Sequence, residues 1–237
     1  MTTTRRVRLV PPPAVPAPHI VPLAAPPVAL VSRSKRALDI ASALVLLLLS
    51  SPIWLAASVL ILVSSPGPIL FRQERVGAGG RTFTCLKLRT MHVGLGDEAH
   101  RAFVIGMMAR NERSDGTARP YKLVDDPRVI PACRWLRKTS LDELPQLINV
   151  LRGEMSMVGP RPPLPYEVER YEQWQHERLS VRPGITGLWQ VSGRNRMTYN
   201  EMCARDIDYI RSWSLLSDLA IMAKTPWVMF VDDGGAA

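Results

Sequence analysis

Hydrophobic residues are most concentrated between Ala37 and Val63, in the run ALDIASALVLLLLSSPIWLAASVLILV of this 237-residue chain. About twenty apolar residues span the hydrocarbon core of a bilayer, so this run is long enough to enter one. A buried helix of a soluble domain is the alternative, and it would be unusually long. The pattern therefore predicts a membrane segment.

The run is interrupted near its middle by Ser51 and Pro52, and clusters of Lys and Arg lie on both sides of it. Proline removes a helical hydrogen bond and favours a kink, while serine hydroxyls can bond the carbonyls that the kink leaves. Cytoplasmic segments concentrate Lys and Arg, so two basic flanks favour two cytoplasmic ends. We predict a re-entrant helix over residues 34–66, broken at Ser51-Pro52, with a kinked single crossing as the open alternative.

One acidic residue, Asp39, lies near the start of the apolar run. We expect it close to the cytosolic interface, paired with Lys35 or Arg36, because side chains three or four positions apart meet on a helix surface.

Beyond the apolar run the pattern changes to alternation, which is typical of strands. The segments ILFRQERV and RTFTCLKLRTM are joined by the glycine-rich residues 77–80, which predicts a β-hairpin. Lys87 and Arg89 alternate with leucines and so share one face of the second strand. That face is either a phosphate-binding surface or simply solvated.

Helical spacing returns after the hairpin. We expect a helix over about residues 97–109, a mobile loop over about 110–124, and a further helix in VIPACRWLRK with Pro131 in its first turn.

The stretch RKTSLDELPQLINVLRGEMSMVGPRP, residues 137–162, contains the candidate chemistry. Ser140 and Glu143 match a capping box, which places Asp142 and Glu143 in the first turn of a helix, where anions are favoured. Pro145 argues for a helix start one or two residues later. The two acids could serve only as helix-end residues, and the surrounding cations, such as Arg137 and Arg161, favour chemistry instead.

A carboxylate next to cations suits reactions at phosphorus. An aspartate can attack a phosphorus atom to give an acyl phosphate, and the cations neutralise the phosphoryl oxygens. A neighbouring carboxylate could hold Mg²⁺, which is typically bound through one or two carboxylates and the substrate phosphates.

Two later segments carry weaker signals. RPGITGLWQVSGR, residues 182–194, predicts a tight loop that ends in Arg194 and could meet a phosphate. The stretch from Asp206 to Phe230 is amphipathic. It is either a helix at the membrane interface or one packed on the core.

Composition and charge limit the kinds of partner and site that this protein can have. The formal charge of +9 requires an anionic partner, without choosing among nucleic acid, lipid and phosphate-rich metabolites. Prolines crowd residues 1–33, which excludes regular structure and predicts a disordered leader. The cysteines (Cys85, Cys133 and Cys203) show no disulfide or zinc pattern, so we interpret them as buried hydrophobes, and the four histidines form no metal motif.

Taken together, the chain over about residues 33–230 resembles the bacterial sugar transferase family, the monotopic polyprenyl-phosphate hexose-1-phosphate transferases. The resemblance is carried by KRALD, the Ser51-Pro52 break, GPILFRQERVG, FTCLKLRTM, DDPR, the central 137–162 block, RPGITGLWQVSGR and YIRSWSLLSDL. Departures, such as Ile130, Cys133 and KLRTM, lie away from the two acids.

The resemblance implies an α+β, mainly helical fold: an N-terminal re-entrant membrane helix, a β-hairpin and amphipathic interfacial helices around a cytoplasmic catalytic core. It implies a short-form member without the additional membrane spans of larger relatives. The corresponding division is a Pro-rich disordered leader (1–33), the re-entrant helix (34–66), a phosphoglycosyl transferase domain (67–231) and a disordered tail (232–237).

The resemblance also implies an activity. A hexose 1-phosphate would pass from a UDP-sugar to undecaprenyl phosphate with release of UMP, through an aspartyl-phosphosugar intermediate, as the first membrane step of exopolysaccharide or glycoconjugate synthesis. Asp142 matches the nucleophile and Glu143 the Mg²⁺ ligand. The phosphate-contacting cations fall on Arg137 and Arg194, with Arg161 a further candidate, and with Lys87, Arg89 and Arg128 serving nucleotide or fold.

The implied location is the cytoplasmic face of the bacterial inner membrane, with both termini cytoplasmic. Membrane lipid is then a partner and nucleic acid is not; a homo-oligomer and downstream glycosyltransferases would be compatible. Family association favours galactose or glucose as the sugar. Two alternatives stay open: a non-catalytic basic membrane adaptor, and a glycosyltransferase that releases UDP.

Overall fold

The computed structural model describes residues 30, 32–94, 96–111, 126–193 and 197–230. The predictions for the leader, for most of the loop at 110–124, for the tail and for Arg194 lie outside these residues. The α-helices and strands in chain order are α1 (Arg33–Ser64), β1 (Leu70–Val76), β2 (Thr82–Leu88), α2 (Glu98–Arg110), α3 (Arg134–Lys138), α4 (Gln146–Arg152), β3 (Ser156–Val158), α5 (Pro165–Val168), β4 (Gly184–Thr186), α6 (Leu188–Val191), α7 (Tyr199–Arg211) and α8 (Leu215–Phe230). Short 3₁₀ helices are η2 (Ala78–Gly80), η3 (Pro131–Cys133), η4 (Leu141–Glu143) and η5 (Gln173–Ser180).

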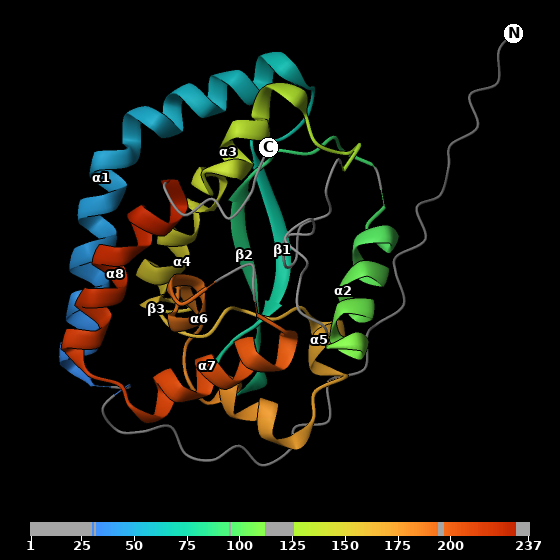
Figure 1. Cartoon of the computed structure of the whole chain (residues 1–237). Helices are drawn as coiled ribbons and strands as arrows, with labels where there is room; N and C mark the ends of the chain where they lie inside the picture. The colour runs from blue at the N-terminus through green and yellow to red at the C-terminus, as the bar shows by residue number, and fades with distance from the viewer. Residues whose placement is uncertain (1–29, 31, 95, 112–125, 194–196, 231–237) are drawn as a thin grey trace, which may run out of the picture.

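The long helix α1 runs up one side of the molecule and then bends over its top, with Pro52 inside it (Figure 1). Pro52 has no N–H for the Leu48 carbonyl four residues earlier, and the Ser51 hydroxyl donates to that oxygen at 2.8 Å. The Ser50 hydroxyl donates to Leu46 O at 2.6 Å. The predicted serine compensation is therefore confirmed, whereas the predicted break is a bend within one continuous helix and does not divide it into two.

Among the described residues, α1 is the one helix long and apolar enough to cross a membrane, judged by length and composition. The most apolar 18-residue window of α1 has a mean hydropathy of 2.4, and 17% of this window is buried inside the protein. Its outer face exposes leucines such as Leu48 (75%) and Leu55 (70%). The re-entrant topology stays a prediction.

The hairpin and the helix that follows it are where the sequence predicted them. Strands β1 and β2 pair antiparallel, and Phe71 lies opposite Lys87. Helix α2 covers Glu98–Arg110, and Pro131 opens the 3₁₀ turn that leads into α3. The mainly helical α+β prediction is confirmed by these elements.

The segment at residues 182–194 differs from the predicted tight loop. It begins with strand β4, which pairs parallel with β3, Ser156 with Gly184 and Val158 with Thr186. A Cβ on Gly159 would lie 2.6 Å from the Arg182 carbonyl oxygen, so glycine is needed for these two segments of the backbone to approach this closely. A three-residue strand with a distant partner leaves no local periodicity, which is why the sequence did not reveal it.

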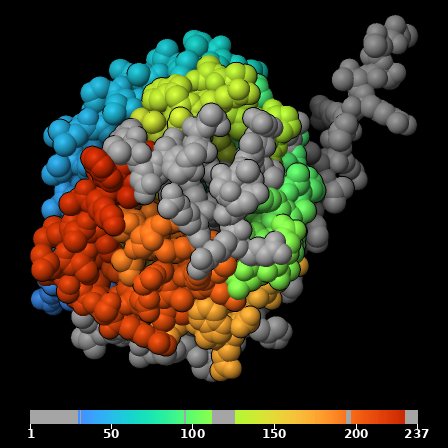
Figure 2. Space-filling model, viewed as in Figure 1, coloured from blue at the N-terminus to red at the C-terminus, as the bar shows by residue number. Residues whose placement is uncertain are grey.

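The core joins α1 to the rest of the domain along its length. Ala43 of α1 packs in one cluster with residues of α4, β3, α7 and α8. Ala57 and Ile61, farther along α1, pack with Leu88, Ile130 and Leu136. Helix α8 lies beside α1, and in Figure 2 the two form one continuous side of the molecule. All three cysteines are buried and free, as predicted.

Candidate active site

The two candidate acids lie on a turn that the sequence described only in part. Ser140 has φ 55° and ψ 18°, and its side chain makes no capping hydrogen bond, so the predicted capping box is wrong. A 3₁₀ turn from Leu141 to Glu143 follows, and α4 begins only at Gln146. The shift beyond the one or two residues expected from Pro145 arises because the left-handed Ser140 breaks the helical path before the acids.

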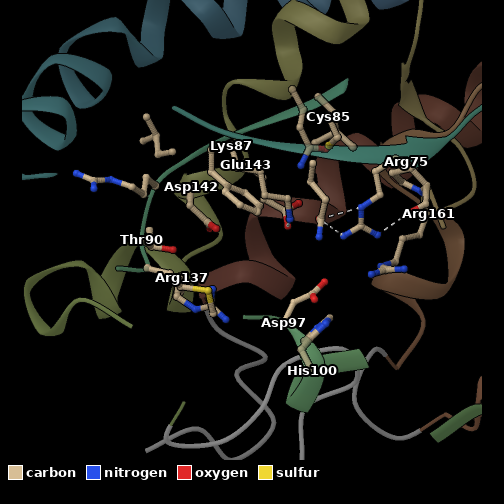
Figure 3. Close-up of a pocket in the computed structure, with 18 of the residues that line it drawn as sticks. Arg75, Cys85, Lys87, Thr90, Asp97, His100, Arg137, Asp142, Glu143 and Arg161 are labelled. Carbon is tan, nitrogen blue, oxygen red and sulfur yellow. Dashed lines mark hydrogen bonds and ion pairs between the residues drawn. The ribbon is translucent and has the colours of Figure 1, made fainter. Parts of the chain in front are cut away.

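This turn places both acids on the wall of a cavity of about 210 Å³. Asp142 is 6% exposed, and Glu143 is partly buried. Asp142 and Glu143 are here called the dyad, and the turn from Leu141 to Glu143 the dyad turn. The cavity is lined by the hairpin, the start of α2, the dyad turn, the turn after β3, and the β4–α6 segment. Figure 3 shows Asp142 and Glu143 at its centre, Arg137 on one side and Arg161 on the other.

Lys87 reaches the dyad from β2. Its Nζ lies 2.8 Å from Glu143 Oε1, and both side chains are roughly three-quarters buried, at 21% and 26% exposure. Of the two cations predicted on one face of the second strand, Lys87 is therefore the one that contacts Glu143. Lys87 lines the cavity, where its charge would act both on Glu143 and on an incoming phosphate.

A pair of arginines forms the opposite wall. Arg75 Nη1 donates to the Pro162 carbonyl at 2.9 Å, and this side chain is 6% exposed. Arg161 forms an ion pair at 3.4 Å with Glu167, which is fully buried. Burial, followed by the neighbouring Arg161 charge, lowers the pKa of Arg75. The two cations thus face one cavity at an electrostatic cost that an anionic ligand would relieve.

The remaining predicted cations separate into two groups. Arg137 lines the cavity. Arg89 also lines it, but its Nη2 donates to Ser65 O at 2.7 Å, which attaches the end of α1 to the hairpin. Arg128 lines it too, but is held by Asp126 at 2.7 Å, and this ion pair lowers the pKa of Asp126. The contacts of Arg89 and Arg128 therefore favour the fold role over the nucleotide role.

Several cavity residues were not among the candidates from sequence. In the sequence, Arg75 is one of the basic residues that follow the apolar run, and nothing singles out Gln73. In the structure, Gln73 accepts a hydrogen bond from Arg75 at 2.7 Å. Asp97 and His100 at the start of α2 line the cavity opposite the dyad (Figure 3). Alternation along FRQERV puts Gln73 and Arg75 on one strand face, and this was the one available signal.

The acidic side chains in the cavity show whether the predicted Mg²⁺ ion could be bound there. Within the described residues no group of three or more His, Cys, Asp or Glu side chains converges on a metal position. Two adjacent carboxylates, Asp142 and Glu143, are present in the cavity. Hard carboxylate oxygens in this number fit an ion that arrives with substrate phosphates and keeps several waters, as Mg²⁺ does.

Comparison with known proteins identifies the family. Residues 30–232 match the model of the bacterial sugar transferase family. The chain belongs to this family.

Its relatives include long and short proteins. The exopolysaccharide production protein ExoY of Sinorhizobium fredii is 46% identical over 81% of this chain and 83% of its own length. The UDP-glucose:undecaprenyl-phosphate glucose-1-phosphate transferase of Caulobacter vibrioides is 43% identical, over 81% of this chain and 67% of that protein. The undecaprenyl-phosphate galactose phosphotransferase of Salmonella typhimurium is 40% identical over 84% of this chain, which spans 41% of that longer protein.

Proposed function

We propose that this protein transfers a hexose 1-phosphate from a UDP-sugar to undecaprenyl phosphate and releases UMP, as the first membrane step of exopolysaccharide synthesis. One observation carries the proposal: the cavity holds an Asp-Glu pair, with Asp142 6% exposed, among side chains of Lys87, Arg137 and Arg161. The activities for which relatives at 40% and 43% identity are named support the substrate classes.

In the first step, a carboxylate oxygen of Asp142 forms a bond to the β-phosphorus of the UDP-sugar. The bond from that phosphorus to the oxygen bridging it to the α-phosphate breaks, and UMP leaves with this oxygen and its electron pair. The attack brings an anion toward an anion, and Lys87, Arg137 and Arg161 around the cavity would offset the repulsion.

In the second step, a phosphate oxygen of the lipid attacks the phosphorus of the aspartyl-phosphosugar. The Asp142–phosphorus bond breaks, the carboxylate is regenerated, and the lipid diphosphate sugar leaves. The same cations serve both steps, because each has a phosphoryl group at one position next to Asp142.

Glu143, together with Asp142, would hold a Mg²⁺ ion that enters with the substrate. When bound, this ion supplies positive charge to the phosphate oxygens. Lys87 holds Glu143 Oε1 at 2.8 Å, so this lysine and the ion would compete for the same carboxylate.

The membrane arrangement fits a lipid acceptor. We propose that α1 enters the cytoplasmic leaflet of the inner membrane and turns back at Pro52, with the domain and both termini cytoplasmic. The support is the bend in α1 and the exposed apolar side chains on its outer face.

The test is nucleotide release by detergent-purified protein given Mg²⁺ and single UDP-sugars, with and without undecaprenyl phosphate. We expect a UMP burst without lipid, turnover with it, and loss of both in Asp142→Asn. UDP in place of UMP would identify a glycosyltransferase. Binding to anionic vesicles without nucleotide release from any UDP-sugar would favour the adaptor hypothesis.

A further inference from the structure

The first turns of α1 carry charges that point into the protein. Lys35 is 2% exposed and Asp39 1% exposed, so both side chains are buried inside the protein. Their predicted pairing is confirmed, at 3.0 Å between Lys35 Nζ and Asp39 Oδ1. Burial of both charges is costly and needs an explanation beyond membrane orientation.

Lys35 joins three elements. Its Nζ lies 2.8 Å from Asp218 Oδ2 of α8 and donates to the Val158 carbonyl of β3 at 3.3 Å. Asp218 is fully buried and also accepts from the Tyr209 hydroxyl of α7 at 2.8 Å. Burial, followed by the Asp218 charge, raises the pKa of Tyr209, so its hydroxyl remains a donor.

Asp39 completes the attachment to β3. Its Oδ1 accepts from the Met157 N–H at 3.0 Å and from the Ser156 hydroxyl at 2.9 Å. Strand β3 runs directly into the Gly159-Pro160-Arg161-Pro162 turn, whose Arg161 lines the cavity. The contacts of Lys35 and Asp39 therefore set the position of the segment that presents Arg161.

Arg36 makes the second attachment. Its Nη1 donates to the Val150 carbonyl at 2.6 Å and its Nη2 to the Leu151 carbonyl at 2.9 Å. These carbonyls belong to the last turn of α4, where helical carbonyls lack partners and a cation is favoured. Helix α4 follows the turn that carries Asp142 and Glu143, so Arg36 is bonded to the helix directly after the two acids.

We propose that Lys35, Arg36 and Asp39, here called the α1 anchor, are positioning residues that hold the two halves of the site in register through the membrane helix. Arg36 fixes α4, the helix that follows the dyad turn, and Lys35 with Asp39 fixes β3 and the Arg161 turn. A buried ion pair adds little to the free energy of unfolding, because desolvation of the two charges offsets their attraction, but it specifies one geometry. The role in turnover rests on the proposed function.

The first readout is hydrogen exchange of the full chain in detergent, which needs no activity. In Lys35→Met we expect amide exchange in residues 156–162 to rise by about tenfold or more, and in Arg36→Gln the same rise in residues 146–154. Exchange in the β1–β2 hairpin should stay unchanged. Arg33→Gln is the matched control, because it removes one cation from the same helix at an exposed position and should alter neither segment.

The second readout is the UMP burst at varied UDP-sugar concentration. A misplaced cation or dyad should lower the limiting rate by about tenfold or more and change KM by less than about twofold. Arg36→Lys keeps the charge and should recover part of the rate lost in Arg36→Gln. Unchanged exchange in both segments, or equal effects in Arg33→Gln, would overturn the proposal.

Lys35→Met leaves two buried aspartates without their cation, and it could unfold the protein. Ser156→Ala then decides the matter, because it removes one donor to Asp39 and keeps every charge. Faster exchange confined to residues 156–162 is expected, and no local change would overturn the proposal. If the wild type released no UMP, the proposed function would fail while hydrogen exchange still tested the α1 anchor.

Discussion

At the scale of single residues, Lys87 connects the hairpin to the dyad. Its ammonium holds one Glu143 oxygen at 2.8 Å and lines the cavity beside Asp142. A metal ion at Glu143 and the Lys87 ammonium would compete for the same carboxylate, whereas a phosphate in the cavity would attract both.

We predict that Lys87→Met separates these effects. Turnover should fall by about tenfold or more because a cation is lost beside the phosphate, while half-saturation should need several-fold less Mg²⁺ because Glu143 loses its competitor. A Mg²⁺ titration of UMP release measures both quantities. Arg72→Met, on an exposed position of the same hairpin, is the control, and a higher Mg²⁺ requirement in Lys87→Met would contradict the competition.

Asp206 and Arg178 form a second buried pair behind the site. Arg178 Nε donates to Asp206 Oδ2 at 2.9 Å, and Arg178 Nη2 donates to the Arg161 carbonyl at 3.3 Å. Burial raises the pKa of Asp206 to about 6, and the Arg178 charge offsets this only in part. The pair thus supports the Arg161 turn through this contact.

This raised pKa predicts a pH dependence of stability. Since the folded state binds the Asp206 proton more tightly than the unfolded state, the free energy of unfolding should fall as pH rises from about 4 to about 6, by roughly 1–3 kcal/mol. Asp206→Asn should remove this slope, and Asp208→Asn, at an exposed position of the same helix, should retain it. Denaturant unfolding at several pH values measures it; an equal slope in Asp206→Asn would contradict the assignment.

At the scale of elements, the bend of α1 depends on a compensated proline. The Ser51 hydroxyl bonds the Leu48 carbonyl that Pro52 cannot reach, so the bend leaves that oxygen satisfied in an apolar environment. Leu88 and Leu136 pack against the segment beyond the bend, through Ala57 and Ile61. The bend and this packing together direct the end of α1 toward the hairpin.

We predict that Pro52→Ala changes the topology of α1. The alanine N–H can bond Leu48 O, which favours a straighter helix, and a fraction of molecules should then cross the membrane completely. Reporter fusions at the N-terminus measure the side on which it lies. Ser51→Ala, which keeps the proline, should leave the terminus on the cytoplasmic side; an all-cytoplasmic Pro52→Ala would contradict the re-entrant proposal.

At the scale of the whole molecule, apolar side chains continue from α1 onto α8. Leu216 is 75% exposed and Trp227 62% exposed on α8, which lies beside α1 on one side of the molecule (Figure 2). Asp218, on the same helix, is fully buried against Lys35. One face of α8 therefore packs on the core, as one of the two sequence hypotheses held, and the other face is apolar and exposed.

We predict that this exposed face of α8 contacts lipid. Trp227→Ala should lower partitioning into anionic vesicles several-fold, because a tryptophan at an interface contributes both apolar area and a polar edge. Vesicle flotation measures the partitioning. Trp174→Ala, at 37% exposure on η5, is the matched control, and equal loss in both variants would argue against a specific role for α8.

The elements that sequence predicted are those with strong local signals. The hairpin follows from alternation around a glycine-rich turn, and α2 from its own spacing. The β3–β4 pairing and the left-handed Ser140 were missed, because the first depends on residues that are far apart in the chain and the second on a backbone conformation that serine adopts rarely. Arg75 was missed because a charge in a strand is ordinarily solvated.

The sequence by itself determined the family, the apolar helix with its Ser51-Pro52 break, and the Asp142-Glu143 pair, because each is written in neighbouring residues. Only the tertiary structure decided which partners each cation meets. It separated Lys87, which meets Glu143, from Arg89, which bonds the end of α1. It also turned Lys35 inward onto β3 and α8. The physical reason is that a charged side chain acts on whatever lies within a few ångströms, and that neighbourhood exists only once distant segments have packed together.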